Sequence, residues 1–207
     1  MIKIYKNPNE FDFKETDVFL HFTGNIFGIG CSAFNEDAIN KILQLKHRDA
    51  NKGFITLFSS LNQAEKHVLP QLKNIKVSSL LNHFYPGNLT AILETEDNRF
   101  EKVWLNNKIG IRIPTSKVLR DFIDKIAHPI VSTSINVSGN PFCTDLNVLH
   151  KEFSDWFDWG LYDEDEPAEQ PLPSTVIDFA SETEIKCLRE GSIPFSTISE
   201  FWAGIKG

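Results

Sequence analysis

The chain has 207 residues, 41% of them hydrophobic and 24% charged, which is typical of a globular protein and excludes a disordered, collagen-like or coiled-coil chain. Its 28 acidic and 21 basic side chains give a formal net charge of -7, so the basic excess that drives tight nucleic-acid binding is absent. The three cysteines lie far apart and no apolar run is long enough for a signal peptide or a membrane span, so we expect a soluble cytoplasmic protein without disulfides or a metal site.

Strand-like and helix-like patterns alternate along the chain, which predicts an α/β fold in which helices cover a sheet. In the first half the strongest helix signal begins at Asn35, a capping residue followed by two acidic residues and by apolar residues at helical spacing. That helix is expected to end near Arg48. The other elements predicted in this half are strands at Asp17–Phe22 and Gly53–Phe58 and helices at Gln63–Lys73 and Val77–Phe84.

The second half opens with the turn sequence Tyr85-Pro86-Gly87. Its clearest helix is an apolar stripe that follows the caps Thr115 and Ser116 and stops before Pro129. The acidic segment Asp163–Gln170 is predicted to be a solvated loop that tolerates replacement of Asp165 or Glu166. The other elements predicted here are strands at Leu89–Glu94, Phe100–Leu105, Ile109–Ile113, Ile130–Ile135, Thr175–Phe179 and Ile185–Leu188, and a helix from Asp145 through Phe157.

Several common motifs are absent from the sequence. It contains no G-x-x-x-x-G-K-[ST] or G-x-G-x-x-G loop, no H-x-x-x-H pair and no G-x-S-x-G elbow. These absences disfavour P-loop, dinucleotide-binding, metalloprotease and α/β-hydrolase functions. Any chemistry must therefore depend on less familiar segments.

Four short segments stand out, and each also has a purely structural interpretation. His21–Cys31 is a strand that runs into a glycine-rich turn, where glycine serves a positive φ. Lys46-His47-Arg48 places two cations at a helix end, where they also offset the helix dipole. Ile109–Pro114 holds one arginine in an apolar strand, either solvated or placed to clamp a carboxylate. Ser132–Gly139 gathers small hydroxyls at the end of a buried strand, where open α/β sheets bind ligands.

Eight segments in this order carry a family resemblance: Phe22–Gly30, Lys46–Arg48, Lys52-Gly53 with Ile55, Tyr85–Thr90, Gly110–Arg112, Ser132–Gly139, Pro173–Asp178 and Leu188–Gly191. They resemble the P-T-E-x-V-[YF]-G-[LV]-G, K-x-R, K-G-x-I, W-P-G-P-[LV]-T, A-V-R, [AS]-T-S-A-N-x-S-G, P-S-T-x-x-D and L-R-x-G motifs of the YrdC family of threonylcarbamoyl-AMP synthases. Each motif is short, but their shared order over most of the chain is specific. The length is similar to that of the short bacterial members.

The resemblance implies a YrdC-like open twisted mixed sheet with packed helices and a concave ligand cleft, built as one domain over residues 1–207. It implies an enzyme, a nucleotidyltransferase that joins ATP, bicarbonate and L-threonine into threonylcarbamoyl-AMP and pyrophosphate. The product serves the threonylcarbamoyladenosine modification of tRNA, so tRNA modification transferase proteins are the expected partners. Mg²⁺ is expected with the nucleotide, and direct nucleic-acid binding is expected to be weak or absent.

The resemblance also assigns residues. The expected ATP-binding residues are Lys46, Arg48, Ser134, Asn136 and Arg189, of which the first four are the catalytic candidates. The expected threonine-binding residues are Thr23, Arg112, Ser132 and Ser174.

Four positions depart from the family motifs: Phe22 for proline, Gly24 for glutamate, Asp49 for proline and Ile135 for alanine. Because Gly24 and Ile135 fall in segments expected to line the site, altered or lost activity stays an alternative. Two further alternatives are a noncatalytic YrdC-like RNA-binding protein and carbamoyl or adenylyl transfer to another acceptor.

Overall fold

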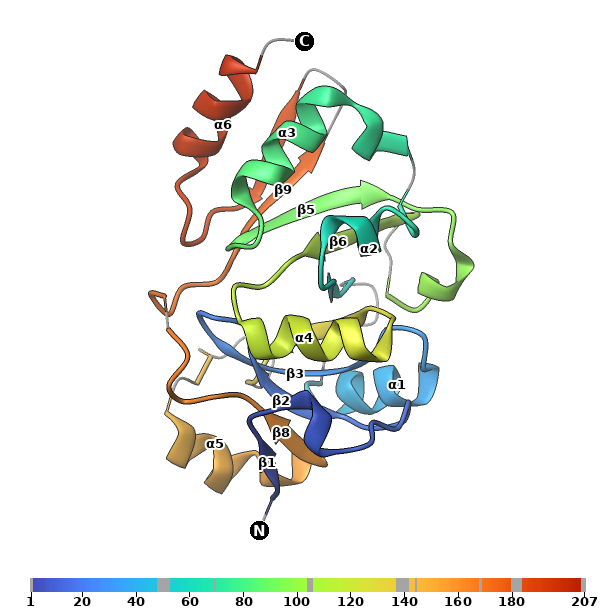
Figure 1. The fold of residues 1–207 in the computed structure, drawn as a ribbon, viewed down its shortest axis with the longest axis vertical. Helices are drawn as coiled ribbons and strands as arrows, with labels where there is room; N and C mark the ends of the chain where they lie inside the picture. The colour runs from blue at the N-terminus through green and yellow to red at the C-terminus, as the bar shows by residue number, and fades with distance from the viewer. Residues whose placement is uncertain are drawn as a thin grey trace.

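The computed structural model describes residues 2–47, 53–68, 70–103, 106–136, 142–143, 145–167, 169–179 and 184–205 (Figure 1). Within these residues ten strands form one mixed sheet in the order β1-β8-β2-β3-β7-β4-β6-β5-β9-β10. The strands are β1 (Ile4–Tyr5), β2 (Phe19–Phe22), β3 (Phe27–Ser32), β4 (Ile55–Leu57), β5 (Leu89–Glu94), β6 (Lys108–Arg112), β7 (Ile130–Ser134), β8 (Trp159–Leu161), β9 (Thr175–Phe179) and β10 (Ile185–Arg189). The predicted α/β fold is confirmed.

The centre of the sheet joins segments that are distant in the sequence. β7 pairs antiparallel with both β3 and β4, and β4 pairs parallel with β6. In this register Gly28 lies opposite Ser134, and Leu57 lies opposite Arg112. The glycine-rich, arginine-bearing and hydroxyl-rich segments therefore meet on neighbouring strands.

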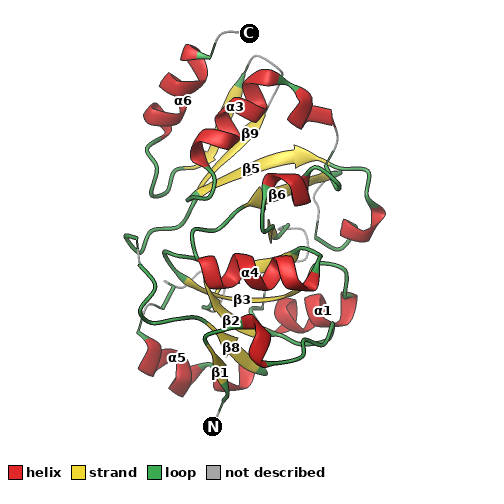
Figure 2. Cartoon of the chain, in the orientation of Figure 1, coloured by secondary structure: helices red, strands yellow, loops and turns green. Residues whose placement is uncertain are grey.

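Helices cover the sheet (Figure 2). Those in the described residues are α1 (Glu36–Leu45), α2 (Leu61–Ala64), α3 (Ile75–Phe84), α4 (Lys117–Ile126), α5 (Leu146–Glu152) and α6 (Phe195–Gly204). The helix caps predicted at Asn35 and Ser116 are confirmed. Asn35 Oδ1 accepts a hydrogen bond from Ala38 N at 2.9 Å, and Ser116 Oγ accepts one from Leu119 N at 3.2 Å. Both side chains satisfy amide groups that the first helical turn leaves free.

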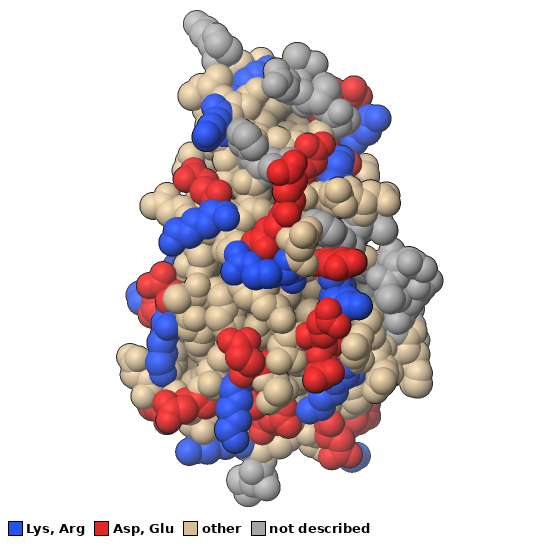
Figure 3. Space-filling model, turned by 90° about the vertical axis from the view of Figure 1, so that its right-hand side faces the viewer, with Lys and Arg blue, Asp and Glu red and all other residues tan. Residues whose placement is uncertain are grey.

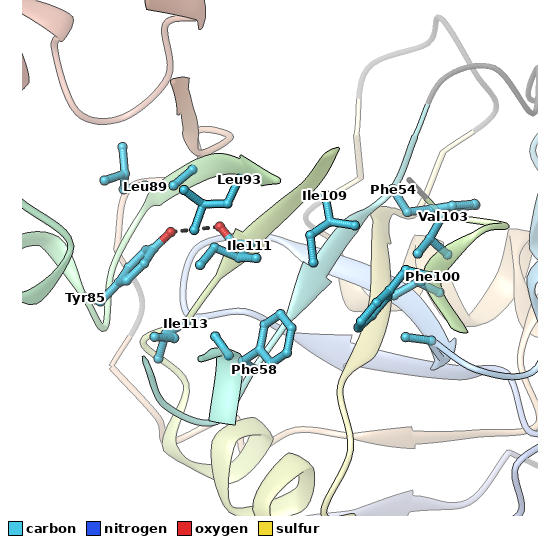
Figure 4. Packing of buried hydrophobic residues seen from close by; sticks show 14 of the residues in the cluster. Phe54, Phe58, Tyr85, Leu89, Leu93, Phe100, Val103, Ile109, Ile111 and Ile113 are labelled. Carbon is cyan, nitrogen blue, oxygen red and sulfur yellow. Dashed lines mark hydrogen bonds between the residues drawn. The ribbon is translucent and has the colours of Figure 1, made fainter. Parts of the chain in front are cut away.

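Aromatic side chains pack beneath α4. Phe122 of α4 lies against Phe19 of β2, with ring centroids 5.2 Å apart, and Phe19 stacks on Trp159 of β8 at 4.5 Å. A larger apolar cluster extends to the strands around β5 and β6. There the Tyr85 hydroxyl donates to the Ile111 carbonyl at 2.8 Å (Figure 4). These clusters hold the central strands rigidly, which fixes the polar side chains at their ends.

The prediction of one helix over Gln63–Lys73 is wrong, because the structure has two separate short elements there. The structure has the short helix α2 followed by a separate 3₁₀ turn at Pro70–Lys73. Pro70 lacks an amide hydrogen and disfavours a helical conformation in the residue before it. The proline therefore prevents one continuous helix.

The strand predicted over Phe100–Leu105 is also wrong for its described part. Asn98–Phe100 forms a 3₁₀ turn, capped by Asp97 through its bond to Arg99 N, and a turn follows it. Phe100 and Val103 are both buried, at a spacing of one helical turn. The hydrogen bond from Arg99 N to the Asp97 side chain thus stabilises a turn, although the apolar residues that follow had indicated a strand.

The glycine-rich segment differs from the predicted turn. The turn is confined to the residues around Gly24, whereas Gly28 and Gly30 lie inside β3. Strands β1, β3 and β8 and helix α6 were not predicted. β1 and β8 are too short to show a pattern, because they have two and three residues.

The described residues of the acidic segment Asp163–Gln170 form a loop, as predicted, but they are not uniformly solvated. Asp165 is 90% exposed. Glu166 instead accepts hydrogen bonds from Ser116 Oγ at 2.6 Å and from the amide groups of Lys117 and Val118. A carboxylate at this position stabilises the N-terminus of α4, so these contacts argue against the expectation that Glu166 can be replaced without loss of stability.

Candidate active site

A cleft of about 1000 Å³ lies over the middle of the sheet and is lined by residues of β3, β7, β4, β6, β5, β9 and β10. Seven sequence-predicted site residues line it: Thr23, Arg112, Ser132, Ser134, Asn136, Ser174 and Arg189. Lys46 contacts the lining from behind, and Arg48 lies outside the described residues. The charged groups in the described lining are three cations, on Lys108, Arg112 and Arg189, and one carboxylate, on Asp178.

Arg112 stands at the end of β6 and is 3% exposed. Its Nε donates to the Gly87 carbonyl at 3.0 Å, and its Nη2 donates to Asn25 Oδ1 at 2.9 Å and to Asn88 Oδ1. Burial lowers the pKa of Arg112 to about 10, so the guanidinium stays charged at neutral pH. Among the described residues, no carboxylate forms an ion pair with it.

The neutral oxygen atoms around Arg112 do not use all of its N–H donors, so some remain for a ligand. Nε and Nη2 are engaged, whereas Nη1 has no hydrogen bond to the described residues. Two of the three guanidinium nitrogens are thus engaged by the protein itself, although the sequence suggested that this arginine clamps a carboxylate. Nη1 is therefore the nitrogen left to bind a carboxylate, whose negative charge would pair with the guanidinium.

Asn25 and Asn88 connect Arg112 to the segment before β9. Asn25 Nδ2 donates to the Leu172 carbonyl, and Asn88 Nδ2 donates to Glu169 Oε2. Each amide group therefore faces the guanidinium with its oxygen and the neighbouring segment with its nitrogen. The two side chains fix the position of Arg112 against the turn after β2.

Gly24 departs from the family motif for a steric reason. Its φ is +99°, and a Cβ atom there would lie 1.7 Å from Thr115 Oγ1. Glycine is required by both the backbone conformation and this contact. The glutamate usual in the motif has no room at this position.

Ile135, the other departure in a segment expected to line the site, is fully buried in the large apolar cluster. It is not part of the cleft lining. The substitution therefore adds apolar packing behind the site and does not narrow the cleft.

Lys46 caps the end of α1 and is 2% exposed. Its Nζ donates to the carbonyls of Ser134 and Asn136 and, at 3.0 Å, to Asn136 Oδ1. Asn136 Oδ1 also accepts a hydrogen bond from Ser134 Oγ at 2.7 Å. The structure therefore brings Lys46 together with Ser134 and Asn136, and Lys46 holds their segment against α1.

Ser174 and Arg189 lie in direct contact, although the sequence assigned them to different substrates. Arg189 Nη2 donates to the Ser174 carbonyl at 2.8 Å, and the Ser174 hydroxyl lies 2.8 Å from Thr90 Oγ1. Burial lowers the pKa of Arg189. The expected amino-acid and nucleotide regions thus share a boundary at Ser174.

Sequence reasoning missed several polar residues of the site. Asn25 and Asn88 hold Arg112, and Lys108 forms an ion pair with Asp178 at 2.9 Å in the cleft. His21 is fully buried beside the cleft and hydrogen-bonds to Ser132. The one available signal was a histidine inside an otherwise apolar strand.

The described residues contain no cluster of three or more histidine, cysteine or carboxylate side chains that could bind a metal ion. Within the same part of the chain, no helix has the length and apolarity needed to cross a membrane.

Comparison with known proteins identifies relatives over most of the chain. The model of a family that includes Sua5, YciO and YrdC, described as "Telomere recombination", matches residues 17–191. The threonylcarbamoyl-AMP synthase of Pseudoalteromonas atlantica is 28% identical over 151 residues, which are 72% of this chain and 80% of that protein.

Solved structures share the fold. P. abyssi Sua5 complexed with L-threonine gives a TM-score of 0.76 at 24% identity, over 90% of this chain and 54% of that one. E. coli YciO gives a TM-score of 0.76 at 19% identity, over 93% of this chain and 97% of that one. The chain therefore spans about half of the Sua5 structure and nearly all of YciO.

Proposed function

The chain belongs to the Sua5/YciO/YrdC family, and we propose that it is a threonylcarbamoyl-AMP synthase that acts as one domain over residues 1–207. The reaction joins L-threonine, bicarbonate and ATP into threonylcarbamoyl-AMP, with release of pyrophosphate and water. The product would pass to a transferase protein that modifies tRNA. The curated relative from Pseudoalteromonas atlantica bears the name of this activity.

One observation carries the proposal: residues that the family motifs assign to two substrates line a single cleft. Its volume of about 1000 Å³ is in the range of cofactor-sized sites. The described lining carries more cationic than anionic groups, which suits a nucleotide and a carboxylate held side by side. If the motifs served only the fold, their polar residues would not be expected to line one cleft together.

The amino-acid side of the cleft is assigned to Thr23, Arg112, Ser132 and Ser174. Arg112 meets the threonine carboxylate through Nη1, and the hydroxyls offer partners for the amino acid's polar groups. The L-threonine in the P. abyssi Sua5 structure supports an amino-acid site in this fold.

The nucleotide side is assigned to Lys46, Arg48, Ser134, Asn136 and Arg189. The cations lower the cost of bringing an anionic nucleophile to an anionic phosphate. Lys46 acts here mainly by holding Ser134 and Asn136 in place. Mg²⁺ would enter with the nucleotide, its charge offsetting that of the phosphates, and no protein ligand for it is assigned.

The chemical step requires alignment more than acid–base catalysis. The carbamate oxygen of carboxylated threonine forms a bond to the α-phosphorus of ATP, while the bond to the β-phosphate oxygen breaks and pyrophosphate leaves. Adjacent amino-acid and nucleotide regions, with their boundary at Ser174, are suited to this in-line arrangement.

The decisive experiment is mass spectrometry of the product formed from ATP, bicarbonate and L-threonine by the full chain. We expect threonylcarbamoyl-AMP together with one equivalent of pyrophosphate. Formation of the corresponding carbamoyl-AMP products equally well from other amino acids would indicate transfer to another acceptor. No adenylated product from any amino acid would contradict the proposal.

RNA binding is tested separately. Acidic and basic side chains are interspersed on the face shown in Figure 3, and its described residues form no broad basic patch there. We expect RNA retention to be weak. Tight retention that falls steeply between low and physiological salt would instead support the RNA-binding alternative.

A further inference from the structure

His21 is a fully buried histidine on β2, next to the cleft but outside its lining. It lies opposite Gly28 of β3, and its ring passes over β3 beside Gly28 and Gly30, which have no side chains. A Cβ on Gly28 would lie 3.2 Å from the ring Nε2, and one on Gly30 would lie 3.0 Å from Cε1. The two glycines therefore create the space through which the imidazole reaches β7.

On β7 the ring meets one polar atom. His21 Nε2 lies 2.8 Å from Ser132 Oγ, whereas Nδ1 has no hydrogen-bond partner among the described residues. Burial lowers the pKa of His21 to about 3; the backbone carbonyl of Phe19 opposes this shift, and the nearby Arg112 charge adds to it. The ring is therefore neutral at physiological pH and carries a single N–H.

The location of that hydrogen decides what Ser132 can do. A hydrogen on Nε2 has an acceptor in Ser132 Oγ at 2.8 Å, whereas a hydrogen on Nδ1 would be a buried donor with no acceptor in hydrogen-bonding geometry among the described residues, the Phe19 carbonyl included. With Nε2 as the donor, Ser132 accepts from His21 and keeps its own hydrogen to donate. Ser132 is 8% exposed, lines the cleft and forms no other side-chain hydrogen bond with the described residues.

We propose that His21 is a positioning residue that fixes Ser132 as a hydrogen-bond donor to the amino-acid substrate in the cleft. The inference rests on the proposed function, which puts Ser132 on the amino-acid side. His21 itself does not line the cleft, so its effect passes through the serine hydroxyl. It should alter recognition of threonine and leave ATP recognition unchanged.

The first test is a double-mutant cycle on threonine-dependent pyrophosphate release. His21→Phe keeps a ring of similar volume without the hydrogen bond, and we expect it to raise the KM for threonine about three- to tenfold with an unchanged KM for ATP. In a Ser132→Ala background the same change should have no further effect. His21→Gln, which restores an N–H donor, should recover part of the loss.

The matched control is His83→Phe, an exposed histidine of α3 that stacks on Phe201 outside the cleft. It should leave both KM values unchanged. A purely structural role for His21 would lower thermal stability without separating the two KM values. Equal effects on both substrates, or full additivity with Ser132→Ala, would overturn the proposal.

The second test does not depend on turnover. Side-chain ¹⁵N NMR of the full chain should show His21 as the neutral Nε2–H tautomer at both pH 7 and pH 5. An Nδ1–H tautomer, or titration near the usual histidine pKa, would overturn the proposal. If the wild-type chain binds threonine but releases no pyrophosphate, the proposed reaction fails alone, and calorimetric threonine affinity replaces KM in the cycle. Absence of threonine binding would overturn both.

Discussion

Two cations of the candidate site, Arg112 and Lys46, are almost fully buried, and within the described residues both donate to neutral oxygen atoms. Arg112 lines the cleft, whereas Lys46 lies behind the segment that does. A guanidinium has five N–H donors and an ammonium has three. Within the described residues, Arg112 can therefore satisfy its protein acceptors and keep Nη1 for a ligand, whereas Lys46 donates to three oxygens of the Ser134–Asn136 segment.

The comparison indicates a division of labour. The Arg112 side can recognise a carboxylate directly, and the Lys46 side organises the Ser134–Asn136 segment for the nucleotide. Replacing the substrate, Lys46 or Arg112 changes one side, and the kinetics show whether the other side responds.

The largest effect is expected from replacing the substrate. Valine has the shape of threonine without its hydroxyl, so it would leave several buried polar groups of the amino-acid side unpaired. We expect kcat/KM for pyrophosphate release to fall about 10⁴-fold with an unchanged KM for ATP. Equal rates with the two amino acids would contradict the assignment of the serine and threonine hydroxyls.

Lys46→Ala should have the next largest effect. It removes the charge and releases the Ser134–Asn136 segment, so pyrophosphate release at saturating threonine should fall roughly 10²–10³-fold. Lys41→Ala is the matched control, because Lys41 is a more exposed cation of the same helix that pairs with Asp158. If Lys46→Ala retains wild-type ATP use and a native circular dichroism spectrum, the nucleotide-side assignment is wrong.

Arg112→Lys keeps a positive charge but loses the planar guanidinium, which can donate to Gly87, Asn25 and Asn88 and still bind a ligand. We expect the KM for threonine to rise roughly 10- to 100-fold, with the KM for ATP nearly unchanged. Arg120→Lys serves as the control, since Arg120 donates to the carbonyls of Pro114 and Thr115 outside the cleft lining. A parallel loss of ATP affinity in Arg112→Lys would remove the distinction between the two sides.

The smallest effect concerns the segment that adjoins Arg112. Glu166→Ala should lower the free energy of unfolding by about 1 kcal/mol, because it removes the carboxylate from the first turn of α4. Asp165→Ala should change it much less, since that side chain is exposed. Urea titrations of both variants provide the measurement, and equal stabilities would show that the Glu166 contacts contribute nothing.

The elements that were predicted correctly are those whose capping residue and apolar pattern lie within a short stretch of sequence. α4 has its cap at Ser116 and its apolar stripe within ten residues, and α1 has its cap at Asn35. The failures also have local causes that outweighed the apolar pattern. Pro70 interrupted one helix, and Asp97 turned a predicted strand into a 3₁₀ turn.

The sequence by itself determined the α/β class and the motif order that marks most of the cleft residues, because capping, periodicity and short motifs act over neighbouring positions. Only the tertiary structure decided how those residues are held. His21 and Ser132 are separated by 111 positions, and Asn25 meets Arg112 across 87. Such contacts depend on strand register and on glycines that allow close approach, and no local pattern encodes them.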